Sequence, residues 1–182
     1  MYAAKIHYYT VAEYLALEND GEQRHEYVNG ELFAMVGASR AHNRLATHLT
    51  MALGTHLRDT PCRVSQSDMK VWIEAAHCFY YPDLMVCCEP VEDEPDEYHE
   101  TRPRLIIEIQ SPSTALRDAT EKRLNYQTLP SLQDYLLLDQ NQPVGTLYRR
   151  EGTDWLRIEL TAADVLELTS LELRLALAEL YR

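Results

Sequence analysis

The sequence predicts an α/β protein in which a mixed α+β sheet is flanked by helices. Two apolar runs, Tyr81 to Cys88 and Arg104 to Ile109, have the continuous hydrophobicity of strands buried on both faces. A long helical pattern precedes them and a second helical segment follows. The chain of 182 residues is long enough to bury a sizeable core and contains no linker or internal repeat. We therefore expect a single domain over residues 1–182.

The N-terminal part of the chain predicts a short helix and a hairpin. Thr10 is a candidate N-cap for a helix from Val11 to Leu17, with the acidic Glu13 in its first turn. Arg24 to Met35 predicts a β-hairpin, because Asn29-Gly30 tolerates the left-handed backbone of a tight turn between strands.

A long helix and two further strands come next. Ser39 is a candidate N-cap for a helix that ends near Arg58. The apolar residues of this helix recur at helical spacing: Leu45, Leu49, Ala52, Leu53 and Leu57. Cys62 to Ser65 and Met69 to Ile73 predict a second pair of strands.

An acidic segment, Glu89 to Arg102, separates the two central strands. Pro90 and Pro95 interrupt it, so we expect a loop. Residues 89–100 contain seven acidic residues and no Lys or Arg. The sequence leaves open whether this loop regulates access to a site.

The second helix follows the second central strand. Ser113 or Thr114 caps a helix from about Ala115 to Leu129, and Pro130 ends it because proline cannot continue a helix.

The C-terminal part predicts three strands and a final helix. Asp134 to Asp139, Val144 to Arg149 and Trp155 to Leu160 have strand-like patterns, and a turn around Glu151-Gly152 joins the last two. The tail from Leu171 to Tyr181 is apolar at mixed periods, and we expect a helix that packs against the core.

Composition narrows the class of protein. Hydrophobic residues make up 46% of the chain, but no apolar stretch approaches the roughly 20 residues that span a membrane, and the N-terminus lacks the apolar core of a signal peptide. We expect a cytoplasmic protein with no membrane partner.

The four cysteines have neither CxxC nor zinc spacing, which favours reduced thiols packed as small hydrophobic residues. Those cysteines are Cys62, Cys78, Cys87 and Cys88.

The net charge of −12 opposes general affinity for nucleic acid, because phosphate contacts dominate such binding. A nucleic-acid site would have to gather the basic residues near the predicted helices into a local positive patch. Those residues are Arg40, Arg44, Arg117, Lys122 and Arg123.

Two carboxylates and a lysine carry the strongest chemical signal. Asp83 begins one central strand after Pro82, and Glu108 lies at the end of the apolar run of the other. Paired carboxylates on a rigid sheet suit Mg²⁺, and a nearby Lys122 would add positive charge where a phosphodiester becomes more anionic. The alternatives are a turn role for Asp83, a salt bridge from Glu108 to an arginine, and a surface ion pair between Asp118 and Lys122.

An ordered series of motifs resembles the Uma2 family (DUF820) of restriction-endonuclease-like proteins, within the PD-(D/E)XK nuclease superfamily. The resemblance covers most of the chain, from about His25 to Tyr148. It rests on Glu26-Tyr27-Val28-Asn29-Gly30-Glu31-Leu32, Ala41-His42-Asn43, Pro82-Asp83, Glu108-Ile109-Gln110-Ser111-Pro112-Ser113-Thr114, Asp118, Lys122, Tyr126 and Tyr135-Leu136-Leu137-Leu138-Asp139.

The resemblance implies a restriction-endonuclease-like core and a metal-dependent catalytic site. Asp83, Glu108 and the backbone carbonyl of Ile109 would be metal ligands for Mg²⁺, or for Mn²⁺. Gln110 stands where the superfamily pattern often places lysine, and Lys122 on the following helix matches the position that the family uses instead. The remaining implied site residues are Glu26 and His42.

The implied activity is endonucleolytic hydrolysis of DNA phosphodiester bonds, with a homodimer expected because cutting two strands usually takes two sites. A different class of function stays open: a catalytically degenerate nuclease-fold scaffold that binds a partner, favoured by the acidic composition and by Gln110. Hydrolysis of another phosphodiester is a third possibility. No Ser-His-Asp arrangement or glycine-rich phosphate loop supports acyl transfer or P-loop nucleotide hydrolysis.

Overall fold

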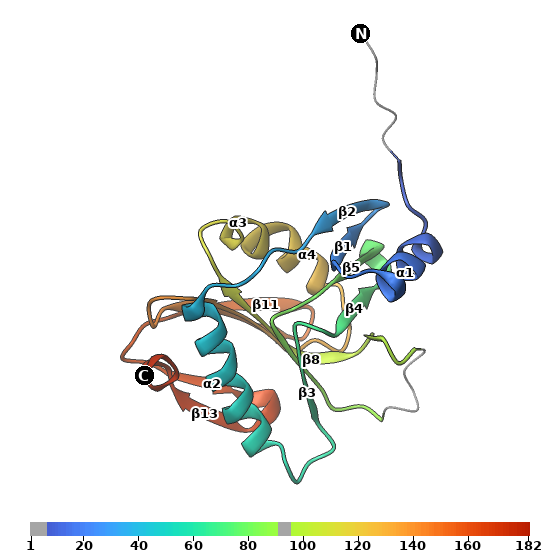
Figure 1. Ribbon diagram of the computed structural model, residues 1–182. Coiled ribbons are helices and arrows are strands. Elements are labelled where there is room, and N and C mark those ends of the chain that lie inside the picture. Colours follow the sequence, from blue (N-terminus) through green and yellow to red (C-terminus); the bar gives the residue numbers. More distant parts are fainter. Residues whose placement is uncertain (1–6, 91–95) are drawn as a thin grey trace.

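The computed structural model describes residues 7–90 and 96–182. Its centre is a mixed six-stranded sheet with the strand order β11-β10-β9-β8-β6-β3 (Figure 1). The strands of this sheet are β3 (Arg63–Gln66), β6 (Leu84–Cys87), β8 (Pro103–Gln110), β9 (Asp134–Asp139), β10 (Gly145–Glu151) and β11 (Asp154–Leu160). The expected central strands are confirmed: β6 and β8 pair antiparallel, and β8 pairs with β9 in parallel.

A second, five-stranded sheet has the order β2-β1-β5-β4-β7. Its strands are β1 (His25–Val28), β2 (Glu31–Ala34), β4 (Lys70–Ile73), β5 (Cys78–Tyr80) and β7 (His99–Glu100). The predicted hairpin is confirmed, with Asn29 and Gly30 both at positive φ between β1 and β2.

The helices begin close to their predicted N-termini. α1 (Val11–Asp20) starts after a complete capping box between Thr10 and Glu13, and α2 (Arg40–His56) starts after Ser39, whose side chain accepts the His42 backbone N–H. The helical segment after β8 consists of α3 (Ala115–Arg117), a π-helical turn η3 (Asp118–Lys122) and α4 (Arg123–Tyr126). The expected helix ends three residues early, at Tyr126 rather than Leu129.

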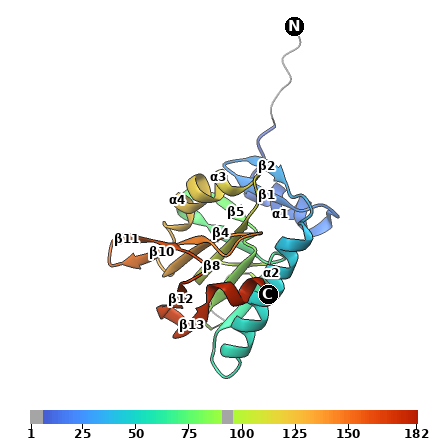
Figure 2. The same ribbon diagram turned by 90° about the vertical axis from the view of Figure 1, so that its left-hand side faces the viewer.

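The two faces of the six-stranded sheet are covered by different elements (Figure 2). Along β8, Leu105 and Ile107 pack with α2 and the C-terminal segment, whereas Ile106 packs with Tyr126 and Tyr135. Because strand side chains alternate between faces, Glu108 lies on the Ile106 face, toward α3 and α4. The two-residue alternation of the strand therefore directs the Glu108 carboxylate toward α3 and α4.

Two expectations about strand arrangement are wrong, and one strand was not predicted. β3 and β4 do not pair with each other: β3 pairs with β6 in one sheet, and β4 pairs with β5 and β7 in the other. Residues 89–102 are not all loop, because His99–Glu100 forms β7 against β4, while residues 91–95 lie outside the described residues. The sequence analysis did not predict β5. Residues Tyr81-Pro82-Asp83, expected to begin the central strand, instead connect β5 in one sheet to β6 in the other.

The C-terminal tail is a hairpin rather than a helix. β12 (Val165–Leu168) and β13 (Leu173–Ala176) pair antiparallel around the short 3₁₀ helix η4 (Thr169–Leu171), and a second 3₁₀ helix, η5 (Leu177–Tyr181), follows β13. Leu166 and Leu168 of β12 point into the core with a period of two, and Leu173 of β13 packs in the same cluster. This period is typical of a strand and explains why the segment does not form the expected helix. A further short helix, η1 (Glu74–Ala76), connects β4 to β5.

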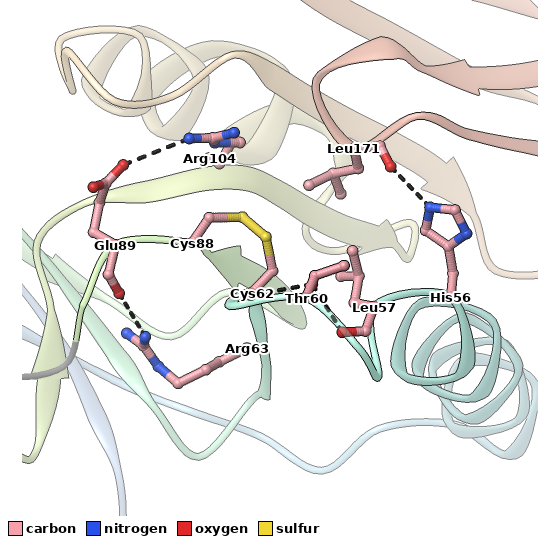
Figure 3. The surroundings of a disulfide bond; sticks show 9 residues. All are labelled: His56, Leu57, Thr60, Cys62, Arg63, Cys88, Glu89, Arg104 and Leu171. Carbon is pink, nitrogen blue, oxygen red and sulfur yellow. Dashed lines mark hydrogen bonds and ion pairs between the residues drawn. A yellow bond between two sulfur atoms is a disulfide. The ribbon is translucent and has the colours of Figure 1, made fainter.

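The prediction that all four cysteines are free is wrong. Cys62 and Cys88 form a disulfide (Figure 3). Cys78 and Cys87 are free and buried. Antiparallel pairing of β3 with β6 places Arg63 opposite Cys87, so the residues just outside this pair face each other. The bond thus arises from strand register, which the spacing of the cysteines along the chain does not reveal. Glu89 beside it accepts a hydrogen bond from Arg63 and contacts Arg104 at 3.5 Å.

Among the described residues, no helix combines the length and apolar character required to cross a bilayer.

Candidate active site

Glu108 is the centre of a buried polar cluster. It has 3% of its surface exposed, on the face of β8 that packs against α4. Its Oε1 atom lies 3.1 Å from Lys122 Nζ and accepts a hydrogen bond of 2.9 Å from the Tyr126 hydroxyl. The arginine partner considered as an alternative for Glu108 is therefore not the one observed, since its cationic neighbour is a lysine.

Glu26 joins this cluster from the first hairpin. Its Oε1 atom lies 2.7 Å from Lys122 Nζ, and its Oε2 atom lies 2.6 Å from Arg117 Nη1. Glu26 is 6% exposed, so it is a buried member of the cluster and not an outward-facing charge on the hairpin. Lys122 thus bridges two carboxylates from different sheets.

The helical segment after β8 presents Asp118, Lys122 and Tyr126 to the site, as their four-residue spacing predicts. All three are buried, and Lys122 Nζ lies 3.8 Å from Asp118 Oδ1. The surface ion pair considered for Asp118 and Lys122 is therefore a buried one. The π-helical turn lies across these residues and positions two of them, Asp118 and Lys122, within its span.

Asp83 lies at the start of β6, against the end of β8. Its Oδ2 atom accepts a hydrogen bond of 2.7 Å from the Ile109 backbone N–H and lies 3.1 Å from His42 Nε2. The hydrogen bond to Asp83 raises the pKa of His42, partly offset by burial. His42 lies in the first turn of α2, so the structure brings this helix to the carboxylate of Asp83.

Gln110 lies apart from the ion pairs. Its side-chain Nε2 donates to the Ala115 carbonyl at 3.1 Å, which ties the end of β8 to the start of α3. Ile109 contributes its backbone N–H to Asp83, and metal ligation by its carbonyl stays a prediction. Gln110 therefore fixes the path of the chain between Glu108 and Lys122.

The positive patch that the sequence analysis required is only partly assembled. Arg117 and Lys122 reach the cluster, whereas Arg123 lies over the Tyr148 ring and donates to the Ala119 carbonyl. Arg40 and Arg44 lie exposed on the first turns of α2. The sequence analysis named Arg117 only as a member of this positive patch, not as a catalytic or metal-binding residue.

Carboxylates outnumber cations in the cluster, and its pKa shifts reflect this. Burial raises the pKa of Glu108 to about 8, opposed by Lys122 and reinforced by Asp118 and other nearby carboxylates. Burial also raises the pKa of Asp118. Burial by itself would lower the pKa of Lys122, but attraction to Glu108, Glu26 and Asp118 outweighs it and raises that pKa. The site keeps a protonated lysine within an excess of negative charge.

The donor set has the chemistry of a hard-cation site. In the described part of the chain, Glu108 Oε1 and Asp83 Oδ2 take all the hydrogen bonds and ion pairs of these two side chains, which leaves Oε2 and Oδ1 without a partner. Mg²⁺ prefers a few carboxylate oxygens and completes its octahedron with water and phosphate. Within residues 7–90 and 96–182, no three His, Cys, Asp or Glu side chains converge as a closed metal cage. The residues therefore fit an open site with few protein ligands.

The sequence matches one family model and is similar to two proteins of one organism. A family model described as "Uma2: Putative restriction endonuclease" matches residues 11–178. The chain is 35% identical over 171 residues to "Uncharacterized protein slr1290" of Synechocystis sp. (strain ATCC 27184 / PCC 6803 / Kazusa), covering 93% of this chain and 90% of that protein. It is 37% identical over 153 residues to "Uncharacterized protein sll1609" of the same organism, covering 83% and 86%.

A solved structure shares the fold. The crystal structure of "a putative nuclease belonging to DUF820" from Anabaena variabilis ATCC 29413 superposes with a TM-score of 0.77. The match covers 95% of this chain and 97% of that one, at 17% sequence identity. At this identity the likeness concerns the fold alone.

Proposed function

The chain belongs to the Uma2 family, and on that premise we propose that it is a metal-dependent endonuclease that hydrolyses phosphodiester bonds of DNA. The observation that carries the proposal is the pair of unengaged oxygens on Asp83 and Glu108, beside a lysine and within a buried excess of carboxylates. Most sites of general acid–base or nucleophilic chemistry do not need such an excess, whereas a cation site does.

Asp83 Oδ1 and Glu108 Oε2 are the proposed ligands for Mg²⁺ or Mn²⁺. A bound ion would supply an acidified water and polarise the phosphate. The Ile109 N–H and His42 hold the other oxygen of Asp83, which fixes the direction of the free one. Lys122 and Tyr126 hold Oε1 of Glu108 in the same way, which fixes the direction of Oε2.

Lys122 also carries the positive charge of the site. Because it is 7% exposed and already contacts three carboxylates, we assign it two tasks: orienting Glu108 and lowering the negative potential where a phosphate approaches. Glu26 holds Lys122 on the side opposite Glu108, and Gln110 keeps α3 anchored to β8.

The test is a calorimetric titration of Mn²⁺ and Mg²⁺ into the wild type and the Asp83→Asn/Glu108→Gln variant, followed by cleavage assays on single- and double-stranded DNA. We expect metal binding and cleavage in the wild type and neither in the variant. Asp154→Asn/Glu159→Gln on the exposed strand β11 is the matched control, since it removes the same charge away from the site. A wild type that binds no metal at millimolar concentration, with or without DNA, would contradict the proposal.

A non-catalytic scaffold is the second candidate. The observation that favours it is that Lys122 is fully engaged and that Gln110, at the position where the superfamily often has lysine, is tied to Ala115. A scaffold would bind Mn²⁺ negligibly, and Asp83→Asn would leave its properties unchanged. Hydrolysis of a different phosphodiester is tested by the same variants with bis(p-nitrophenyl) phosphate as substrate.

The homodimer and the cytoplasmic location belong to this proposal as predictions. The mass of the protein in solution, measured by light scattering at micromolar concentration, tests the dimer.

A further inference from the structure

Phe33 is an exposed aromatic residue at the border of the candidate active site. It lies on β2, the edge strand of the five-stranded sheet, and 39% of its surface is exposed. The pairing of β1 with β2 sets Phe33 directly opposite Glu26, and opposed residues in an antiparallel pair project from the same face. Phe33 therefore projects from the face of the hairpin on which Glu26 contacts Lys122.

The other face of this hairpin is covered by the protein. Tyr27 and Leu32, the next opposed pair, pack with Tyr14 of α1. On the face of Phe33 the neighbouring element is α3, which lies beside β2 in both views (Figures 1 and 2). The exposed surface of Phe33 is therefore at the border between β2 and α3, on the side of the candidate active site.

Arg117 of α3 supports one face of the Phe33 ring. The centre of its guanidinium lies 4.6 Å from the centre of the ring, which is the geometry of a cation–π contact. The guanidinium is itself held by Glu26 at 2.6 Å and by Glu121 at 3.1 Å, so the ring rests on a fixed group. Within residues 7–90 and 96–182, no other aromatic ring stacks on Phe33. The second face of the ring is available to a ligand.

A short series of contacts joins Phe33 to the candidate metal ligand Glu108. Arg117, under the ring, contacts Glu26, and Glu26 Oε1 lies 2.7 Å from Lys122 Nζ. Lys122 Nζ in turn lies 3.1 Å from Glu108 Oε1. Because every step is a direct contact, an extended strand with a phosphodiester at Glu108 can place a nearby base on Phe33.

The charges around Phe33 favour a neutral, flat ligand over a phosphate. Two carboxylates already hold Arg117, and the exposed Glu31 projects from the same face of β2 as Phe33. The net charge of −12 also opposes phosphate contacts. Stacking of a base on an aromatic ring needs no positive charge and accepts any base. A nucleobase is therefore the part of a nucleic acid that fits this position.

We propose that Phe33 stacks on an unpaired base of the substrate strand, near the phosphodiester that is cleaved, and that Arg117 holds the ring in place. The inference rests on the proposed function and names its substrate class. A base that stacks on a side chain is not stacked within a duplex, so the preferred DNA has a single-stranded segment at the site of cleavage. This contact positions the strand and carries no sequence information.

The first test compares two strands that differ only in their bases. A fluorescein-labelled eight-nucleotide thymidylate and an abasic strand with the same phosphates are titrated with protein and followed by anisotropy, in EDTA so that no metal-dependent cleavage occurs. The wild type should bind the thymidylate more tightly. Phe33→Leu should reduce this ratio of affinities by about 5- to 150-fold, the effect of losing one stacking contact, whereas Phe33→Trp should retain the ratio.

The matched control is Tyr8→Leu. Tyr8 is another exposed aromatic residue, but it lines a hollow with Tyr27 on the α1 side of the hairpin, so its loss should leave the ratio unchanged. Phe33 is partly exposed on an edge strand, and Phe33→Leu should therefore unfold at nearly the same temperature as the wild type. Equal ratios in the wild type and in Phe33→Leu overturn the inference. Absence of binding to either strand also overturns it.

The second test observes the stacking itself. Phe33→Trp places an indole at this position, and the wild type corrects for the fluorescence of the two native tryptophans, Trp72 and Trp155. We expect saturating thymidylate to quench the added indole and the abasic strand to leave it unquenched. No quenching at saturation overturns the inference.

Both tests measure binding, so their failure is distinguishable from failure of the proposed function. A protein that shows the stacking response but cleaves no DNA keeps this inference as a base-binding site and loses the proposed endonuclease activity. A protein that cleaves DNA with equal ratios in the wild type and Phe33→Leu keeps the activity and loses the stacking contact.

Discussion

The ammonium group of Lys122 lies 2.7 Å from Oε1 of Glu26, and this contact joins the helix after β8 to the first hairpin. Glu26 belongs to the five-stranded sheet, whereas Lys122 packs over the six-stranded one. This ion pair and the neighbouring Arg117–Glu26 pair therefore hold the two layers of the site together.

Lys122→Met should be strongly destabilising. It leaves Glu26, Glu108 and Asp118 buried without their shared cation, and breaking a buried pair costs about 3–5 kcal/mol. Urea denaturation measures the loss of the free energy of unfolding. The surface pair of Arg157 with Glu159 is the control, because Arg157→Met should change that free energy by less than about 1 kcal/mol. Equal effects of the two variants would contradict the buried pair.

Stability should fall with rising pH on account of Glu108. Burial raises the pKa of Glu108 to about 8, above its ordinary value near 4.5, so the folded state holds more protons than the unfolded state between these values. The free energy of unfolding of the wild type, minus that of Glu108→Gln, should therefore decrease from about pH 4.5 to about pH 8 and then level off. Urea denaturation in EDTA at four pH values checks this. A difference that rises over this range would show a depressed pKa instead.

Loss of the Cys62–Cys88 disulfide should destabilise the protein. The two cysteines are 26 residues apart, and closing a loop of that length is worth about 3.5 kcal/mol in the chain-entropy account. Cys62→Ser/Cys88→Ser should therefore unfold at lower urea than the oxidised wild type. Dithiothreitol should lower the wild type to the level of the variant and leave the variant unchanged. A variant that also responds to dithiothreitol would point to a different disulfide.

Free thiols of the native protein should be unreactive. Cys78 and Cys87 are buried, and burial raises the pKa of Cys78 to about 12, so almost no thiolate exists at pH 8. We expect Ellman's reagent to label neither cysteine in the native state and two per chain after unfolding without reductant. Four labelled thiols under those conditions would mean that the disulfide is absent.

His42→Ala should weaken metal binding without abolishing it. His42 holds Asp83 Oδ2, but the Ile109 N–H holds the same atom, so the carboxylate loses one of two supports. Removing such an outer contact typically lowers metal affinity by about 10- to 100-fold. Calorimetry with Mn²⁺ measures the change, and thermal unfolding of the metal-free proteins separates it from a general loss of stability. Unchanged affinity would exclude a positioning role for His42.

The local signals in the sequence were reliable wherever neighbouring residues decide the structure. The Thr10 and Ser39 caps, the Asn29-Gly30 turn and the continuous apolar run of β8 each depend on a few adjacent residues. The resemblance to a nuclease family singled out Asp83, Glu108 and Lys122, and the structure brings Glu108 to Lys122 directly and Asp83 to the adjoining end of β8.

The sequence by itself determined most of the elements as far as β11, except β5 and β7, and the chemical character of the site. Only the tertiary structure decided which distant residues meet: Glu26 with Lys122, Cys62 with Cys88, and Phe33 with Arg117. It also placed β3 and β4 in different sheets. Periodicity and capping act over a few residues, whereas strand register and the burial of charge depend on the packing of the whole chain, which no local pattern encodes.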